Sequence, residues 1–234
     1  MKLLRWLWVV VTLGLLAQAF YVAMFVVPPD QTQGEIQRIF YYHIGSWCGM
    51  SVFFAINLGA SIVYLVYRNR NTQRAMKADA LAVSAAEMGV VFCTVGLVTG
   101  SLWARPVWGI WWTWDARLTT TLVLWLIYVS YLILRRFSTS GQTQVLAAAF
   151  AVFGFADVPI VYMSIRWFRT QHPSPVIGGG PDSGLAPAIM QTLLINVAAF
   201  TLLGLVYIWL SYKLQREEQA LEAAHAQAAL RGAA

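Results

Sequence analysis

The sequence predicts an all-α integral membrane protein, a bundle of six transmembrane helices that forms a single membrane domain over residues 1–234. Of the 234 residues, 59% are apolar and only 11% are charged, less than half of the charged fraction of about 25% in an ordinary soluble domain. Six separate apolar stretches each supply the roughly 20 residues that a spanning helix needs. These observations exclude a disordered chain, a collagen-like chain and a water-soluble enzyme.

The first apolar stretch, residues 6–27, is preceded by Lys2 and Arg5 and contains Ala17-Gln18-Ala19, which resembles a signal-peptide cleavage site. The apolar run nevertheless continues to Pro28, too far for the apolar region of a signal peptide, so we expect a retained span. The five further spans are expected at residues 40–67, 79–103, 118–134, 144–165 and 187–210.

Two segments outside these spans have distinctive compositions. Residues 104–117 are expected to form a short tryptophan-rich loop between the third and fourth spans. The tail 211–234 is rich in alanine and has few helix breakers, so we expect it to extend the last helix.

The distribution of Lys and Arg predicts the orientation. Eleven of them lie at the N-terminus, in 68–78, in 135–143 or in the tail, whereas five lie in 28–39, 104–117 and 166–186. The positive-inside rule therefore places both termini in the cytoplasm and the tryptophan-rich loop on the outer face. The net charge of +6 is accounted for by topology, so we expect the lipid bilayer, and no nucleic acid, as the partner of these cations.

Two histidines fall in the segments assigned to the outer face. His43 lies near the start of the second span, and His172 lies between the fifth and sixth spans. Two neutral imidazoles can ligate a haem iron from opposite faces. Taken singly, a histidine at a helix end is more often a hydrogen-bonded interfacial residue.

Five tryptophans within residues 103–114, flanked by Arg105 and Arg117, add to this pattern. An aromatic wall suits a flat apolar macrocycle, and guanidinium groups bind carboxylates such as haem propionates bidentately. The competing interpretation is an aromatic belt at the membrane surface with arginines that meet lipid headgroups. A belt requires neither the Gly109 nor the Asp115 that stand in the same short segment.

The string Trp108-Gly-Ile-Trp111-Trp112-Thr-Trp114-Asp115-Ala-Arg117-Leu-Thr resembles the WWD signature of haem-handling proteins in cytochrome c biogenesis. Within that superfamily, which includes the longer CcmF and CcsA types, the chain resembles the CcmC family of the System I maturation pathway over about residues 30–210. The similarity extends to Arg38-Ile-Phe-Tyr-Tyr-His43, to Gly100-Ser-Leu-Trp103-Ala-Arg105-Pro106 and to the segment from Pro159 to Trp167.

This resemblance implies a haem b site on the outer face. His43 and His172 match the two axial ligands of the haem iron, and Arg38 matches an arginine that is a candidate propionate contact. The platform residues implied by the match are Trp108, Trp111, Trp112, Trp114, Asp115 and Arg117, beside Arg105.

The resemblance also implies a role. Proteins of this family hold haem and deliver it to the haem chaperone CcmE during c-type cytochrome maturation, in a complex with CcmA, CcmB and CcmD. The implied location is the bacterial inner (plasma) membrane, with the haem site facing the periplasm or the cell exterior. Such a protein presents a cofactor and transfers it, and need not break bonds as an enzyme does.

Two alternatives stay open. Glu87 and Asp157 are carboxylates within apolar spans, and such groups often serve transport, so a transporter of haem or another solute is the rival hypothesis. An electron-carrying b-type cytochrome is disfavoured because its histidine pairs lie at bilayer depth, whereas His43 and His172 lie at the rim. A loop with the run Gly178–Gly180 follows His172 and is a candidate hinge for haem release.

Overall fold

The computed structural model describes residues 2–138, 142–173, 175 and 184–232. Within this part of the chain the regular structure is helical, apart from one isolated bridge between Asp30 and Gly34. The run Gly178–Gly180 lies outside the described residues. The elements are α1 (Lys2–Tyr21), the π-helix η1 (Val22–Val26), the 3₁₀-helix η2 (Glu35–Arg38), α2 (Ile39–Tyr67), α3 (Thr72–Trp108), α4 (Ala116–Phe137), α5 (Thr143–Phe155), α6 (Asp157–Trp167) and α7 (Pro187–Gly232).

Six helical segments are long and apolar enough to cross a membrane, which confirms the predicted all-helical class and the number of spans. Their bounds run beyond the predicted apolar stretches because helices continue into the polar interface. The segments are Leu3–Val26, Glu35–Tyr67, Thr72–Trp108, Ala116–Phe137, Thr143–Trp167 and Pro187–Arg231.

The third helix shows the largest difference from the expected bounds. α3 continues through Pro106 to Trp108, so the connection to α4 covers only residues 109–115 rather than 104–117. Gly109 ends α3 in the left-handed conformation, with φ of 79°, and its N–H donates to the Arg105 carbonyl. A left-handed residue after the last turn is a common helix terminator, and glycine adopts it without strain.

The fifth span is two helices rather than one. α5 ends at Phe155, and α6 begins at Asp157 after Ala156 donates a short-range bond to the Phe153 carbonyl. Pro159 explains the break, because it has no N–H to donate to the carbonyl four residues earlier.

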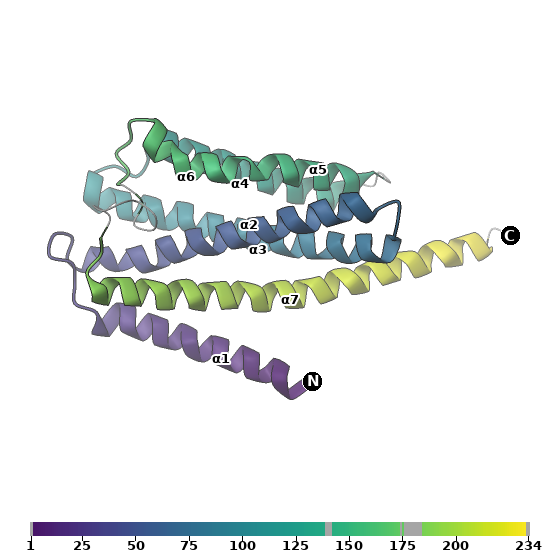
Figure 1. Cartoon of the computed structure of the whole chain (residues 1–234), viewed down its shortest axis with the longest axis horizontal. Helices are drawn as coiled ribbons and strands as arrows, with labels where there is room; N and C mark the ends of the chain where they lie inside the picture. The colour runs from purple at the N-terminus through teal and green to yellow at the C-terminus, as the bar shows by residue number, and fades with distance from the viewer. Residues whose placement is uncertain (1, 139–141, 174, 176–183, 233–234) are drawn as a thin grey trace.

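Figure 1 shows how the helices are arranged. α2 and α3 pack most extensively and form the centre of the bundle, α7 lies against both, and α1 lies against α7 at one edge. α4, α5 and α6 cover the other side. The N- and C-terminal helix ends lie at the same end, whereas the α1–α2 and α3–α4 connections, the end of α6 and the start of α7 lie at the opposite end, which we call the loop end.

Glycines let the central helices approach closely. A Cβ atom on Gly89 of α3 would collide with the ring of Phe54, and one on Gly204 of α7 would collide with Phe53. Phe54 in turn stacks on Tyr128 of α4, with ring centroids 3.6 Å apart. Small residues that admit large neighbours are the usual means of helix association in a bilayer, where apolar burial alone offers little advantage.

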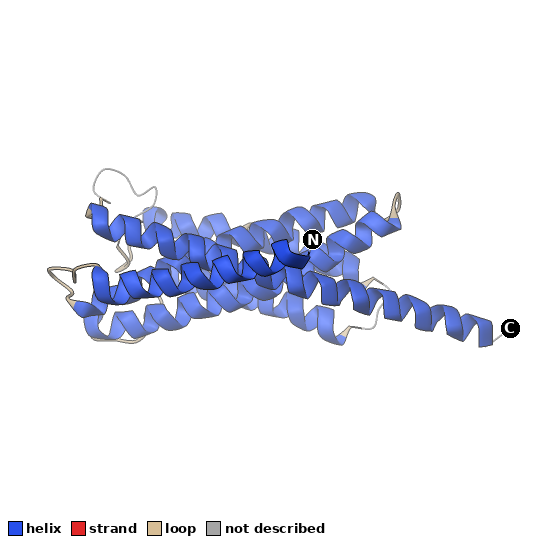
Figure 2. Cartoon of the chain, turned by 90° about the horizontal axis from the view of Figure 1, so that it is seen from below, coloured by secondary structure: helices blue, strands red, loops and turns tan. Residues whose placement is uncertain are grey.

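Polar ties connect helices away from the loop end. Glu87 of α3 accepts a hydrogen bond of 2.7 Å from the Ser211 hydroxyl and one of 3.3 Å from the Tyr207 hydroxyl, both on α7. Asp79 forms an ion pair of 2.9 Å with Arg135 of α4. Figure 2 shows α7 extending well past the bundle, so the tail is helical as expected.

Candidate functional site

His43 occupies a buried position one turn into α2, where its side chain is only 5% exposed. Its Nδ1 atom lies 3.0 Å from the Thr99 hydroxyl of α3. That hydroxyl donates to the Val95 carbonyl at 2.6 Å, so it accepts from Nδ1–H. The proton is therefore on Nδ1, and the lone pair of the ring is on Nε2, the arrangement found in histidines that bind metals through Nε2.

That lone pair accepts a hydrogen bond from the indole of Trp47. Trp47 lies one turn after His43 on α2, and its Nε1–H donates to His43 Nε2 at 3.1 Å. Trp103 adds a second aromatic neighbour, at 5.8 Å between ring centroids in an edge-on arrangement. The imidazole is thus enclosed by two indoles and a hydroxyl.

Two glycines of α3 provide the space for these rings. A Cβ on Gly100 would lie 2.9 Å from His43 Cε1, and a Cβ on Gly96 would lie 2.9 Å from Trp47 Cε2. His43 and Trp47 are four residues apart on α2, and Gly96 and Gly100 are four residues apart on α3, which is about one helical turn in each case. This matched spacing is the sequence pattern that could have identified the packing. The sequence alone did not lead us to Trp47 or Thr99.

The tryptophan-rich connection begins and ends with helix terminators. Gly109 closes α3, and the Asp115 carboxylate caps α4 by accepting from the Leu118 N–H at 2.9 Å. Between them the Trp111 side chain is 55% exposed and the Trp114 side chain is 76% exposed. Trp112 is partly buried, with its ring 5.7 Å from that of Trp114. The WWD segment therefore presents indole surface at the loop end.

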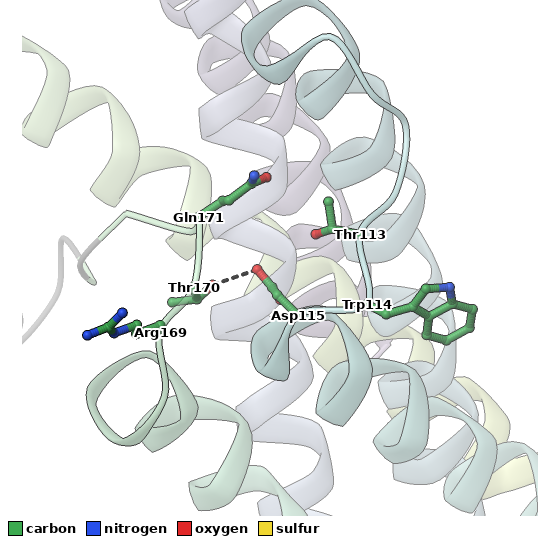
Figure 3. A pocket seen from close by; sticks show the side chains of 6 residues that line it. All are labelled: Thr113, Trp114, Asp115, Arg169, Thr170 and Gln171. Carbon is green, nitrogen blue, oxygen red and sulfur yellow. Dashed lines mark hydrogen bonds between the residues drawn. The ribbon is translucent and has the colours of Figure 1, made fainter.

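Asp115 also joins this connection to the segment after α6. Its second carboxylate oxygen accepts from the Thr170 hydroxyl at 2.6 Å (Figure 3). The Thr170 oxygen accepts from the His172 backbone N–H at 3.0 Å. In Figure 3, Trp114 and Arg169 extend away from this contact on opposite sides. Asp115 thus sets the position of the chain that carries His172.

His172 lies beside the end of α3. Its ring centroid is 6.3 Å from that of Trp108, in an edge-on arrangement, and its Nδ1 lies 3.1 Å from the Pro173 carbonyl. Burial and the nearby Arg117 guanidinium lower the pKa of His172 below the ordinary value of 6.5. The imidazole is therefore neutral at physiological pH, which is the form that ligates a metal.

The three arginines predicted as propionate contacts each donate to a backbone carbonyl in this structure. Arg38 binds the Glu35 carboxylate and the carbonyls of Ala23 and Val27 at the end of the first span. Arg105 bonds to the Gly109 carbonyl. Arg117 donates to the Val161 carbonyl of α6 at 2.6 Å. These arginines fix helix ends around the loop end, and Arg38 is directed toward α1.

An open pocket lies between the WWD connection and the segment after α6. It has a volume of about 510 Å³ and is lined by Thr113, Trp114, Asp115, Arg169, Thr170 and Gln171. Volumes of about 300–1,000 Å³ are typical of ligand pockets. Arg169, counted in the sequence only as an outer-face cation, supplies the exposed guanidinium here.

The chemistry of these groups fits haem. The two imidazoles are held at the same end of the bundle, His43 beside Trp103 and His172 beside Trp108 of α3. Exposed indole rings offer an apolar surface, and the buried Trp112 Nε1–H and Thr113 hydroxyl have no hydrogen-bond partner among the described residues. Buried donors in native proteins are nearly always hydrogen-bonded. A haem propionate is an acceptor that could satisfy these two donors.

The chain is similar to known proteins along most of its length. The family model described as Heme exporter protein C matches residues 1–227. A putative cytochrome c biosynthesis ccmC-like mitochondrial protein of Marchantia polymorpha is 32% identical over 213 residues, 88% of either chain.

Two bacterial relatives carry the name Heme exporter protein C. The one from Bradyrhizobium diazoefficiens is 36% identical over 205 residues, covering 86% of this chain and 74% of the relative. The one from Escherichia coli K12 is 34% identical over 179 residues, covering 76% and 69%. With a matching family model, a WWD connection between two helix terminators and six candidate membrane spans, the chain belongs to the Heme exporter protein C (CcmC) family of cytochrome c biogenesis.

Proposed function

We propose that this protein binds haem b at the loop end of the bundle, with His43 and His172 as axial ligands, and delivers it to the haem chaperone CcmE. The observation that carries the proposal is the packing of both imidazoles against tryptophans in the last turns of α3, which lead into the WWD connection. His43 packs on Trp103, and His172 packs on Trp108, one helical turn or so further along α3. The Asp115–Thr170 hydrogen bond ties the second ligand to the same connection.

Each group has a distinct part in holding the cargo. The exposed indoles of Trp111 and Trp114 cover porphyrin surface, which stabilises the complex by about 25 cal/mol per Å² of apolar area removed from water. Donors at the rim, Arg169 above all, orient the propionates, since guanidinium binds carboxylates strongly. No bond of the porphyrin is broken, so the protein acts in transfer rather than as an enzyme.

The proposed setting follows from orientation and family. The loop end faces the periplasm or cell exterior of a bacterial inner membrane, with both termini in the cytoplasm, because the cations concentrate at the opposite end. CcmA, CcmB and CcmD are the proposed companions, by analogy with the family. Haem delivered to CcmE on that face must be accessible from it. The exposed side chains of Trp111 and Trp114 support this.

Haem titration of the purified protein tests the ligand assignment. We expect His43→Ala and His172→Ala each to weaken haem binding more than about tenfold, since losing even an outer-shell partner of a metal ligand has that effect, and to shift the Soret band. The third histidine, His225, is exposed on the extended part of α7, so His225→Ala is the matched control. Wild-type affinity and spectra in both ligand variants would refute the assignment.

The rival hypothesis, transport through intramembrane carboxylates, has weaker support. Glu87 is engaged by two hydroxyls of α7, which gives it a packing role. Asp157 stands at the start of α6, where a carboxylate favours the positive end of the helix dipole. Solute flux into proteoliposomes that is lost in Glu87→Gln, in a protein that binds no haem, would favour transport instead.

A further inference from the structure

The Nε2 atom of His43, the nitrogen proposed to coordinate iron, already accepts a hydrogen bond. The Trp47 indole donates to Nε2 at 3.1 Å, and the Thr99 hydroxyl accepts from Nδ1 at 3.0 Å. Iron requires the same Nε2 lone pair that the indole occupies, and one lone pair cannot serve both. Resting on the haem-binding function proposed above, we propose that Trp47 is a latch that competes with haem iron for His43.

The two hydrogen bonds of the ring have opposite effects on iron binding. The bond to Thr99 stays intact when Nε2 coordinates, and it fixes the tautomer and raises the basicity of the ring, as outer-shell partners of metal-bound histidines do. The bond from Trp47 must break. Thr99 therefore favours haem binding, whereas Trp47 opposes it and protects an otherwise unpaired buried acceptor.

The surroundings determine which ring moves. Both rings fit against a glycine of α3, His43 against Gly100 and Trp47 against Gly96. The imidazole is also buried and hydrogen-bonded to Thr99, so it is held in place. Trp47 is only partly buried. Rotation of the indole away from Nε2 is thus the movement that frees the lone pair, and its return is the movement that helps expel haem during transfer.

Paired substitutions test the latch through haem affinity. Trp47→Phe removes the competing donor, so we expect haem to bind about 2–10-fold more tightly, the fold-change equivalent to one net hydrogen bond. Thr99→Val removes the supporting acceptor, so we expect about tenfold weaker binding. Trp125→Phe is the matched control, because Trp125 donates to Thr94 at 2.8 Å between α4 and α3 and does not touch His43.

A second measurement needs no haem. The chain has three histidines, so nitrogen-15 spectra of histidine-labelled protein resolve each ring. We expect the Nε2 resonance of one Nδ1-protonated histidine to shift in Trp47→Phe and to stay in place in Trp125→Phe. An unchanged resonance together with wild-type haem affinity in Trp47→Phe would overturn the latch. The ligand assignment would then still stand, since it fails only if His43→Ala binds haem normally.

A separate feature lies at the terminal end of the bundle. An apolar groove of about 770 Å³ runs between α1, α2, α3 and α7, with Trp8, Val63, Leu81 and Leu205 among its lining residues. Arg74 and Lys77 line its mouth. Two further cations flank it: Lys213 Nζ lies 3.8 Å from the Trp209 ring centroid, and Arg5 lies 5.8 Å from it.

These cations have no ion-pair partner in the described part of the chain, where the ion pairs are Arg38 with Glu35 and Arg135 with Asp79. An apolar groove with a ring of uncompensated cations at one end complements a molecule with an acyl chain and an anionic head. Basic sites between transmembrane helices recognise such lipids, at about 1 kcal/mol per cation near the surface. We infer that the groove binds an anionic phospholipid.

Native mass spectrometry of the detergent-purified protein tests this site with phosphatidylglycerol and phosphatidylcholine as probes. We expect retention of phosphatidylglycerol over phosphatidylcholine, and about tenfold or greater loss of that retention in Arg74→Gln/Lys77→Gln. Arg68→Gln/Arg70→Gln removes equal charge from the neighbouring connection outside the groove and should retain the lipid. Equal retention of both lipids, displacement by inorganic phosphate alone, or a groove covered only by a partner subunit would overturn the inference.

Discussion

Asp115 uses its two carboxylate oxygens for two different purposes. One oxygen caps the first turn of α4, and the other accepts from Thr170 on the segment that carries His172. A capping carboxylate contributes about 1 kcal/mol to a helix. The same residue therefore both starts a helix and positions a proposed ligand, which explains why an aspartate ends the run of tryptophans.

The Thr170 link can be broken without disturbing the cap. In Thr170→Val the valine neither donates to Asp115 nor accepts from the His172 N–H, so His172 loses its defined position. A hydrogen bond to a charged group contributes about 1.5–3 kcal/mol, and we expect haem affinity to fall about tenfold or more. Thr120→Val, where the hydroxyl bonds only within α4, is the control for haem titration. Undiminished affinity in Thr170→Val would contradict this role.

Sequence analysis found most of the candidate site residues but not their partners. His43 and His172 stood out because the chain has only three histidines, and the WWD residues stood out because five tryptophans fall within residues 103–114. The contacts of Arg38, Arg105 and Arg117 with backbone carbonyls were not predictable, because they depend on how helix ends meet in three dimensions. Trp47 was missed because a tryptophan inside a span is ordinarily a packing residue.

The pairing of α2 with α3 is the element on which the His43 side of the site depends. Gly100 and Gly96 bring the α3 backbone close to His43 and Trp47, so the two helices place the rings as a unit. Helix–helix contacts through small residues are tight and tolerate little added volume. The register of α2 against α3 is thus coupled to the orientation of the imidazole.

Gly100→Ala tests this coupling. Its Cβ would lie 2.9 Å from His43 Cε1, so we expect a loss of about 1–3 kcal/mol from overpacking, which exceeds the gain of up to about 1 kcal/mol in helix propensity. The readouts are the thermal midpoint in detergent and haem affinity, both lowered. Gly14→Ala, on α1 with no atom within 4 Å of the added Cβ, should be neutral or stabilising. Equal behaviour of the two variants would show that Gly100 is not a packing requirement.

At the scale of the whole molecule, successive spans alternate in direction, so the α1–α2 connection, the α3–α4 connection and the segment after α6 lie at one end (Figure 1). The sequence predicted this arrangement from the apolar stretches alone, since span number fixes which connections share a side. The sequence could not place the ends of α3 and α4. Gly109 ends α3 because its backbone is left-handed, and Asp115 begins α4 because its side chain accepts from Leu118 N–H, and both features are visible only in the structure.

Labelling of introduced cysteines tests the orientation of the bundle. In a background without Cys48 and Cys93, a membrane-impermeant maleimide should label Ile110→Cys in intact spheroplasts, because residue 110 lies in the exposed connection between α3 and α4. Asn69→Cys, in the connection between α2 and α3, should react only after permeabilisation. The reverse pattern would place the indole surface in the cytoplasm and exclude delivery on the outer face.

The two halves of the site meet at the hydrogen bond between Thr170 and Asp115, residues separated by 55 positions along the chain. Breaking such a bond requires about 1.5–3 kcal/mol, only a few multiples of thermal energy. Opening of this bond would separate the segment that bears His172 from the connection that carries Asp115. In the proposed haem transfer, release of the second ligand at this joint would therefore draw on thermal energy.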